Sequence, residues 1–212
     1  MVVNFGANTA QFKETCKGFM ENTVVSTKDK ILDVSQDLIQ KRGFNAISFQ
    51  DIADLVGIKK PSITHHFASK EALGIAVVQR YRNVFSIALN RLTNDETVTA
   101  MQALRFYFTP YQDLGETGDK ICLCASLAGE FMALPADMQT EVAHFFDDHL
   151  NWLEGILAKG KKSGEFNFSE TPKDLAYLFI DALQGSLIVQ RATKNFTQLD
   201  RVIASLTERL KS

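Results

Sequence analysis

Prolines are scarce in this sequence, and its positive and negative charges nearly balance. The 212 residues include only four prolines, twelve glycines and three cysteines, and the formal net charge is −2. So few helix-breaking residues, placed between long uninterrupted runs, indicate helices joined by short turns. A nearly neutral chain cannot bind nucleic acid through a uniformly positive surface, so any such function needs a local basic patch.

The cysteines and the apolar runs exclude further classes of protein. An odd number of cysteines without a C-x-x-C pair indicates neither a disulfide framework nor a zinc site, and it favours a reducing, cytoplasmic location. The most apolar segment, residues 175–189, is interrupted by Asp181 and Gln184 and is too short to span a bilayer. The sequence therefore predicts a soluble protein with no membrane partner.

The spacing of apolar residues is helical along most of the chain, and no segment alternates long enough to form a strand. We expect an all-α protein with a three-helix head and a larger helical body. Its predicted parts are an N-terminal extension over 1–26 with a short helix near 10–20, a head over 27–73 and a body over 74–212. Predicted helices cover 28–42, 61–66, 70–92, 96–116, 120–134, 136–162, 170–192 and 196–211, and another very short helix lies between Ser48 and Gly57.

Two short helices in the head have clear start and stop signals. In the stretch SFQDIADLVGIKKPSITHHFASKEAL, Ser48 and Asp51 form a capping box, and Gly57 closes the first helix. Pro61 suits the first turn of the second helix. We expect Ile52, Leu55 and Val56 to face inward from the first helix, and Ile63 and Phe67 to anchor the second. Two short helices packed on a longer one predict a helix-turn-helix.

The second short helix carries side chains that can bind DNA phosphates and base edges. They are Lys59, Lys60, Ser62, Thr64 and His65, and Lys70 follows at the start of the next helix. The alternative for a basic pair alone is a solvated surface. A helical scaffold that does not read DNA is the second class of function considered.

The segment ILDVSQDLIQKRGFNAISFQDIADLVGIKKPSITHHFASKEAL resembles the DNA-binding domain of the TetR family of bacterial regulators. The resemblance implies a homodimeric repressor that binds a palindromic double-stranded operator and is released by a small-molecule inducer. It also implies a recognition helix over 61–66, with DNA contacts from Ser48, Lys59, Lys60, Ser62, Thr64, His65 and Lys70. Two positions depart from the family pattern, because Thr64 stands where an aromatic residue is usual and Lys59 stands where serine is common.

The last two predicted helices carry an apolar stripe with small residues that would let a partner helix approach closely. The resemblance implies that they pair with their symmetry mates as a four-helix bundle. The expected interface consists of Phe179, Ala182, Gly185, Ser186, Leu199, Ile203 and Leu206. Such a stripe also fits a core within one chain.

The middle of the body is rich in aromatic residues, and the resemblance implies a ligand cavity there. The candidate lining residues are Phe106, Tyr111, Cys122, Phe131, Phe145 and Trp152. Plain core packing is the alternative for most of them.

Cys122 has a sharper interpretation. The segment GDKICLCASLAGEF resembles the N-ethylmaleimide-responsive branch of the family, in which a cysteine at this place senses electrophiles. A helix N-terminus and Lys120 would lower the pKa of its thiol. The alternative is an inert buried thiol.

Catalysis and metal binding have weaker support. Glu141, His144 and Asp148 share one helix face and could touch a metal, but a solvated face is the favoured interpretation. No nucleophile, base and orienting group are recognisable together, so we predict neither a catalytic site nor a cofactor.

Overall fold

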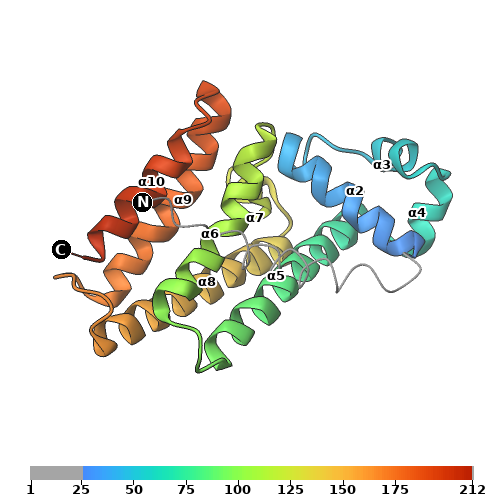
Figure 1. The fold of residues 1–212 in the computed structure, drawn as a ribbon. Coiled ribbons are helices and arrows are strands. Elements are labelled where there is room, and N and C mark those ends of the chain that lie inside the picture. Colours follow the sequence, from blue (N-terminus) through green and yellow to red (C-terminus); the bar gives the residue numbers. More distant parts are fainter. Residues whose placement is uncertain (1–25, 212) are drawn as a thin grey trace.

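The computed structural model describes residues 26–211, which form an all-α fold as predicted (Figure 1). In this part of the chain no strand occurs, apart from one isolated bridge between Asn167 and Lys211. The predicted short helix near residues 10–20 lies outside the described residues. The elements are α2 (Thr27–Arg42), α3 (Phe49–Val56), α4 (Lys60–His66), α5 (Lys70–Asn94), α6 (Ala100–Thr117), α7 (Leu123–Ala128), the 3-10 turn η1 (Phe131–Ala133), α8 (Ala136–Ser163), α9 (Pro172–Thr193) and α10 (Gln198–Arg209).

The head is built from α2, α3 and α4, whose ends are set by the predicted signals. The Ser48 hydroxyl accepts from the Asp51 backbone N–H, and the Asp51 side chain accepts from the Ser48 N–H, which completes the capping box. Gly57 closes α3 with a φ of 77°, in the left-handed region that glycine adopts without strain. Pro61 lies in the first turn of α4, and Ser69 caps α5.

Leu55 was expected to face inward, and this prediction is wrong: its side chain is 62% exposed. The inward face of α3 consists of Phe49, Ile52, Ala53 and Val56, which recur at i, i+3, i+4 and i+7. Leu55 lies beyond the edge of that stripe. Apolar character alone therefore does not place a side chain in the core.

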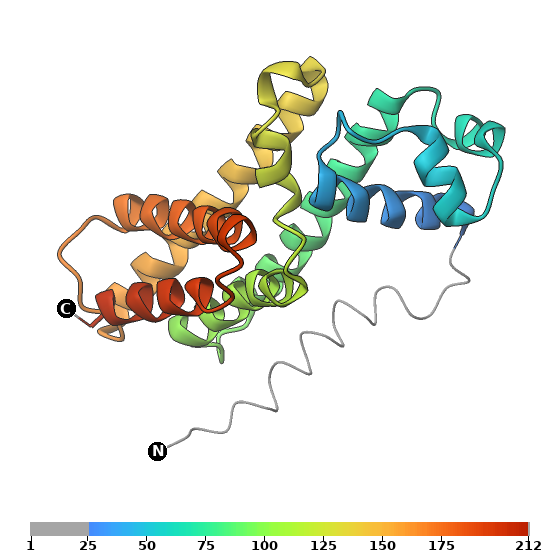
Figure 2. The same cartoon turned by 90° about the horizontal axis from the view of Figure 1, so that it is seen from above.

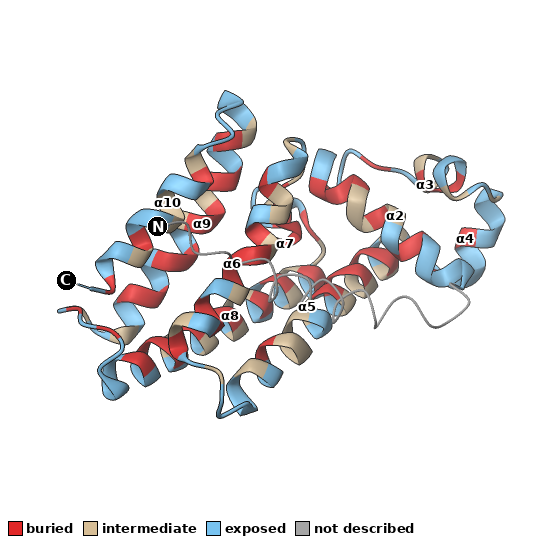
Figure 3. Cartoon of the chain, viewed as in Figure 1, coloured by how far each residue is buried: buried red, intermediate tan, exposed pale blue. Residues whose placement is uncertain are grey.

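Helix α5 runs from the head into the body and packs along α8 (Figures 1 and 2). The body continues with α9, which packs on α8, and with α10, which packs on α9. Buried residues follow the faces where these helices meet, while the outer faces are exposed (Figure 3). A single hydrophobic core thus links the head to the body.

Three predicted helix boundaries in the body are wrong. Helix α6 begins after a capping box at Thr99 instead of at residue 96, and α9 begins after a cap at Thr171 instead of at residue 170. The predicted helix over 120–134 is only α7 and η1, because residues before Cys122 bond to the head instead of continuing a helix. Local sequence signals cannot register that long-range contact.

Among the helices of residues 26–211, none combines the length and the apolar character needed to cross a membrane.

Candidate DNA-binding head and ligand pocket

Helix α4 presents a polar face to solvent. The side chains of Lys59, Lys60, Ser62, Thr64 and His65 are exposed. The apolar anchor predicted beneath them is buried: Ile63 is 0% exposed and Phe67 is 5% exposed. The anchor therefore holds α4 on the head and leaves its polar residues exposed on the outer face of the helix.

The Thr64 hydroxyl is engaged within α4, since it donates to the Pro61 carbonyl at 2.9 Å. This bond keeps the side chain close to the helix. A threonine here reaches less far than the aromatic residue that the family usually has.

Ser48 and Lys70 also have partners inside the head. The Ser48 hydroxyl donates to Asp51 Oδ2 at 2.5 Å. Lys70 Nζ donates to the Asn45 carbonyl at 3.4 Å and lies 4.6 Å from the centre of the Phe44 ring. Burial lowers the pKa of Lys70. Both side chains stabilise the head, so binding to DNA would require them to share or exchange these contacts.

The structure brings together half of the predicted ligand residues. Tyr111, Cys122 and Phe145 line a small apolar cavity of about 10 Å³, room for roughly one water molecule. Its other lining residues are Tyr81, Phe85, Pro110, Leu114 and His149.

The other predicted ligand residues lie outside this cavity. Trp152 stacks on Tyr107, donates its indole N–H to the Leu89 carbonyl and lines a separate surface groove between α5 and α8. Phe106 and Phe131 are partly buried in α6 and η1. Helical spacing placed all of these aromatic residues in the body, but it could not tell which of them face one another.

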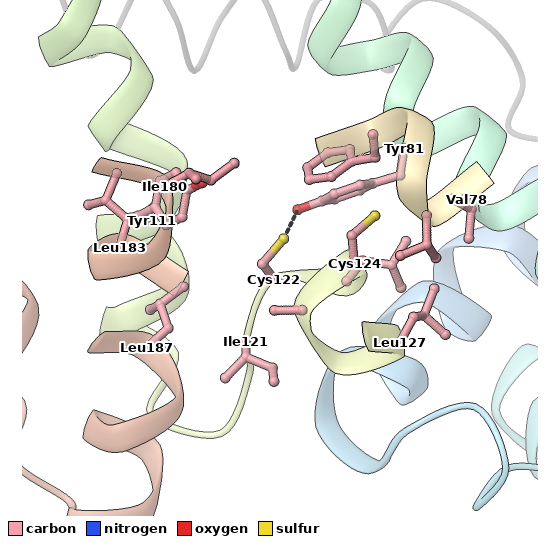
Figure 4. Packing of buried hydrophobic residues seen from close by; sticks show 14 of the residues in the cluster. Val78, Tyr81, Tyr111, Ile121, Cys122, Cys124, Leu127, Ile180, Leu183 and Leu187 are labelled. Carbon is pink, nitrogen blue, oxygen red and sulfur yellow. Dashed lines mark hydrogen bonds between the residues drawn. The ribbon is translucent and has the colours of Figure 1, made fainter. Parts of the chain in front are cut away.

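Cys122 lies directly before α7, as predicted, but its thiol is not activated. The residue is 3% exposed, and the Tyr81 hydroxyl donates to its sulfur at 3.8 Å (Figure 4). Burial raises the pKa of the Cys122 thiol, which is the opposite of the predicted shift. Lys120 binds Asp37 of α2 at 2.5 Å instead of favouring the thiolate.

A buried polar network that was not predicted from the sequence lies beside the cavity. Tyr107 Oη lies 3.0 Å from His149 Nδ1 and 3.3 Å from Tyr111 Oη, and Gln184 Nε2 donates to Tyr111 Oη at 3.1 Å. One feature of the sequence could have indicated this network. His149 falls on the apolar stripe of α8, four residues after Phe145, where a polar side chain is unusual.

The predicted dimer residues divide into two groups. Phe179, Ser186, Leu199 and Leu206 are buried within the chain itself, so they form core and not free surface. Ala182, Gly185 and Ile203 are partly exposed. An added Cβ at Gly185 would meet no atom within 4 Å, which leaves room for a partner helix. Leu178, Ile188 and Val189 add exposed apolar side chains to the same helix.

The acidic face of α8 binds a side chain of the same protein, Arg82 of α5. Arg82 of α5 contacts Asp148 at 2.6 Å and Glu141 at 3.4 Å, and its Nη1 lies 3.5 Å from His144 Nδ1. A guanidinium thus occupies the place where a metal had been considered.

Comparison with known proteins agrees with this architecture. A family model described as bacterial regulatory proteins, tetR family, matches residues 31–77, and a second, described as tetracyclin repressor-like, C-terminal domain, matches residues 100–206. The chain belongs to the TetR family of bacterial regulators.

The named relatives are repressors and regulators. HTH-type transcriptional repressor DhaR of Mycobacterium sp. (strain GP1) is 26% identical over 185 residues, covering 84% of this chain and 92% of that protein. A TetR transcriptional regulator from Legionella pneumophila has a TM-score of 0.80 at 31% identity, covering 89% of this chain and all of that one. Reduced NemR of E. coli shares the fold, with a TM-score of 0.75 at 21% identity over 88% of this chain and 98% of that one.

Proposed function

We propose that this protein is a cytoplasmic, ligand-responsive transcriptional repressor that binds operator DNA and acts by binding, not by catalysis. The exposed polar face of α4 above its buried anchor carries the proposal. Lys59 and Lys60 would bind phosphates, while Ser62, Thr64 and His65 would reach base edges.

The test measures the affinity of the protein for the DNA upstream of its own gene. Fluorescence anisotropy gives this affinity over a range of salt concentrations. Lys60→Ala should weaken binding and reduce the salt slope by about one for each subunit, because each lost phosphate contact releases fewer counterions. Lys162→Ala is the matched control, since Lys162 is an exposed lysine of the body. Equal affinities and slopes for both variants would favour a scaffold that does not read DNA.

The operator-binding form is proposed to be a homodimer. A two-fold axis would present two α4 helices to the halves of a palindromic site. Ala182 and Gly185 of α9, together with Ile203 of α10, lie on the partly exposed surface that suits this contact. Gly185→Leu should hinder close approach of the partner helix, and sedimentation would then detect monomer.

The inducer is proposed to be a small apolar molecule that fills the cavity between α5, α6, α7 and α8. No residue lining that cavity carries an ionised side chain at neutral pH. A reactive electrophile is the second candidate, because Cys122 lines the same cavity. Cys122→Ser should abolish release by an electrophile and preserve release by an unreactive ligand.

Two routes connect the cavity to the head. Tyr81 and Phe85 line the cavity from α5, which begins in the head. The segment before α7 bonds to α2, where Gln40 Nε2 donates to the Ile121 carbonyl at 3.2 Å and the Ile121 N–H donates to the Gln40 carbonyl at 3.4 Å. A ligand that favours a different arrangement of these contacts would change the spacing of the two heads and lower operator affinity.

A further inference from the structure

An imidazole buried in the body has one nitrogen without a protein partner. His149 is 1% exposed, and its Nδ1 lies 3.0 Å from Tyr107 Oη. Its Nε2 is buried and has no hydrogen-bond partner among residues 26–211. Buried polar groups in folded proteins almost always have a partner, so this atom suggests a contact made by a ligand.

The position of the ring is well defined. Its centre lies 4.1 Å from that of Phe145 and 5.3 Å from that of Phe85, and the same two aromatic residues line the cavity with His149. Packing against aromatic rings and the bond to Tyr107 together fix the orientation of the imidazole. The unpartnered nitrogen therefore belongs to a rigid group at the wall of the cavity.

We assign the hydrogen-bond chain that leads to this ring the direction in which each tyrosine hydroxyl donates to its next neighbour. Gln184 Nε2 donates to Tyr111 Oη, so the Tyr111 hydroxyl can donate to Tyr107, and Tyr107 can donate to His149 Nδ1. A neutral ring that accepts at Nδ1 carries its hydrogen on Nε2. An N–H donor therefore lies buried behind the apolar wall of the cavity, which His149 helps to form.

The surroundings select against charged ligands. Burial lowers the pKa of His149 to about 4 and raises the pKa values of Tyr81, Tyr111 and Cys122. All four side chains are thus neutral at physiological pH. An ion that entered would lose its hydration without gaining a counter-charge.

We propose that the cavity binds a small uncharged carbonyl compound with an apolar or aromatic body, whose oxygen accepts a hydrogen bond from His149 Nε2. This inference rests on the proposed function, in which the body of the protein binds an inducer. His149 is then the residue that distinguishes a carbonyl compound from a hydrocarbon of the same shape. Because the cavity is small and its wall covers Nε2, the ligand must separate the rings of Phe85 and Phe145 as it enters and so uncover this nitrogen.

The experiment compares acetophenone with ethylbenzene, which has the same ring but no carbonyl, and with benzoate, which is charged. Binding to the full-length protein is measured by ligand-observed NMR. The wild type should bind acetophenone about tenfold more tightly than ethylbenzene, because the hydrocarbon leaves the buried N–H unpaired. Benzoate should bind more weakly than acetophenone.

Variants at His149 test which group makes the distinction. His149→Phe keeps an aromatic ring without the donor and should bind the two uncharged probes equally. His149→Gln keeps an N–H donor and should retain a preference for the ketone. His144→Phe, an exposed position on the same helix, should behave as the wild type.

Two results would overturn the proposal: no preference for acetophenone in the wild type, or an unchanged preference in His149→Phe. The wild type offers an independent check if that variant does not fold. NMR of the imidazole nitrogens should show hydrogen on Nε2 and a shift of Nε2 when acetophenone is added, and hydrogen on Nδ1 would refute the assignment.

Operator binding is recorded separately. A protein that binds acetophenone through His149 but never binds its upstream DNA would refute the repressor function alone.

Discussion

Replacing His149 by glutamine should make the protein less sensitive to acid. Burial lowers the pKa of His149 from 6.5 to about 4, because the interior of the body penalises the charged ring. The unfolded chain therefore takes up this proton at a higher pH than the native protein does. The free energy of unfolding must fall as the pH drops below 6.5 towards 4, and His149 contributes no such loss above that range.

The size of the effect follows from the two pKa values. One pKa unit corresponds to about 1.4 kcal/mol, so the full difference amounts to about 3 kcal/mol at acidic pH. About 2 kcal/mol of it should be lost between pH 7.5 and pH 5, since the unfolded form is then largely protonated and the native form largely is not. Carboxylates with lowered pKa values, such as Asp37, add their own pH dependence, but the wild type and the variant share it.

The assay is urea unfolding at both pH values and at one fixed protein concentration, because an oligomer's stability depends on concentration. His149→Gln should lose about 2 kcal/mol less than the wild type between the two pH values. His144→Gln is the control on the same helix and should match the wild type. If His149→Gln and the wild type lose stability in parallel, His149 is not buried in its neutral form, and the expected acid sensitivity is refuted.

Three further predictions concern packing and reactivity. Gly160→Ala should destabilise the protein by about 1–3 kcal/mol in urea, because the added methyl would meet an aromatic ring, whereas Gly155→Ala faces open space and should stabilise it by about 0.5–1 kcal/mol. If the Gly160→Ala variant proved at least as stable as the Gly155→Ala variant, this prediction would be contradicted. Ile52→Ala should cost about 2–5 kcal/mol and Leu55→Ala less than about 0.5 kcal/mol, and equal costs would refute the assigned orientation of α3. Iodoacetamide at neutral pH should label Cys122 much more slowly in the native protein than in urea, as mass spectrometry can check, and fast native labelling would exclude a buried thiol.

Local sequence patterns were sufficient to predict where the short helices of the head begin and end. Ser48 and Asp51, Gly57 and Pro61 set the ends of α3 and α4 through contacts that span only a few residues. Such signals act within one turn of the chain, so they can be read before any packing is known. The all-α class followed for the same reason, from helical periodicity over long runs.

The candidate sites in the body depended on tertiary contacts. Cys122 was correctly placed at the start of a helix, but the packing of Tyr81 and other distant residues around it reversed the predicted pKa shift. His149 gave only a weak signal, because its importance comes from Tyr107, which lies 42 residues away.

The all-α class, the turn between α3 and α4 and the family to which the chain belongs could thus be predicted from the sequence alone. Tertiary packing sets which side chains face the cavity, and it also sets which apolar residues of α9 and α10 are core and which are surface. The physical reason is that helix formation is governed by neighbours in sequence, whereas burial and pKa values are governed by neighbours in space.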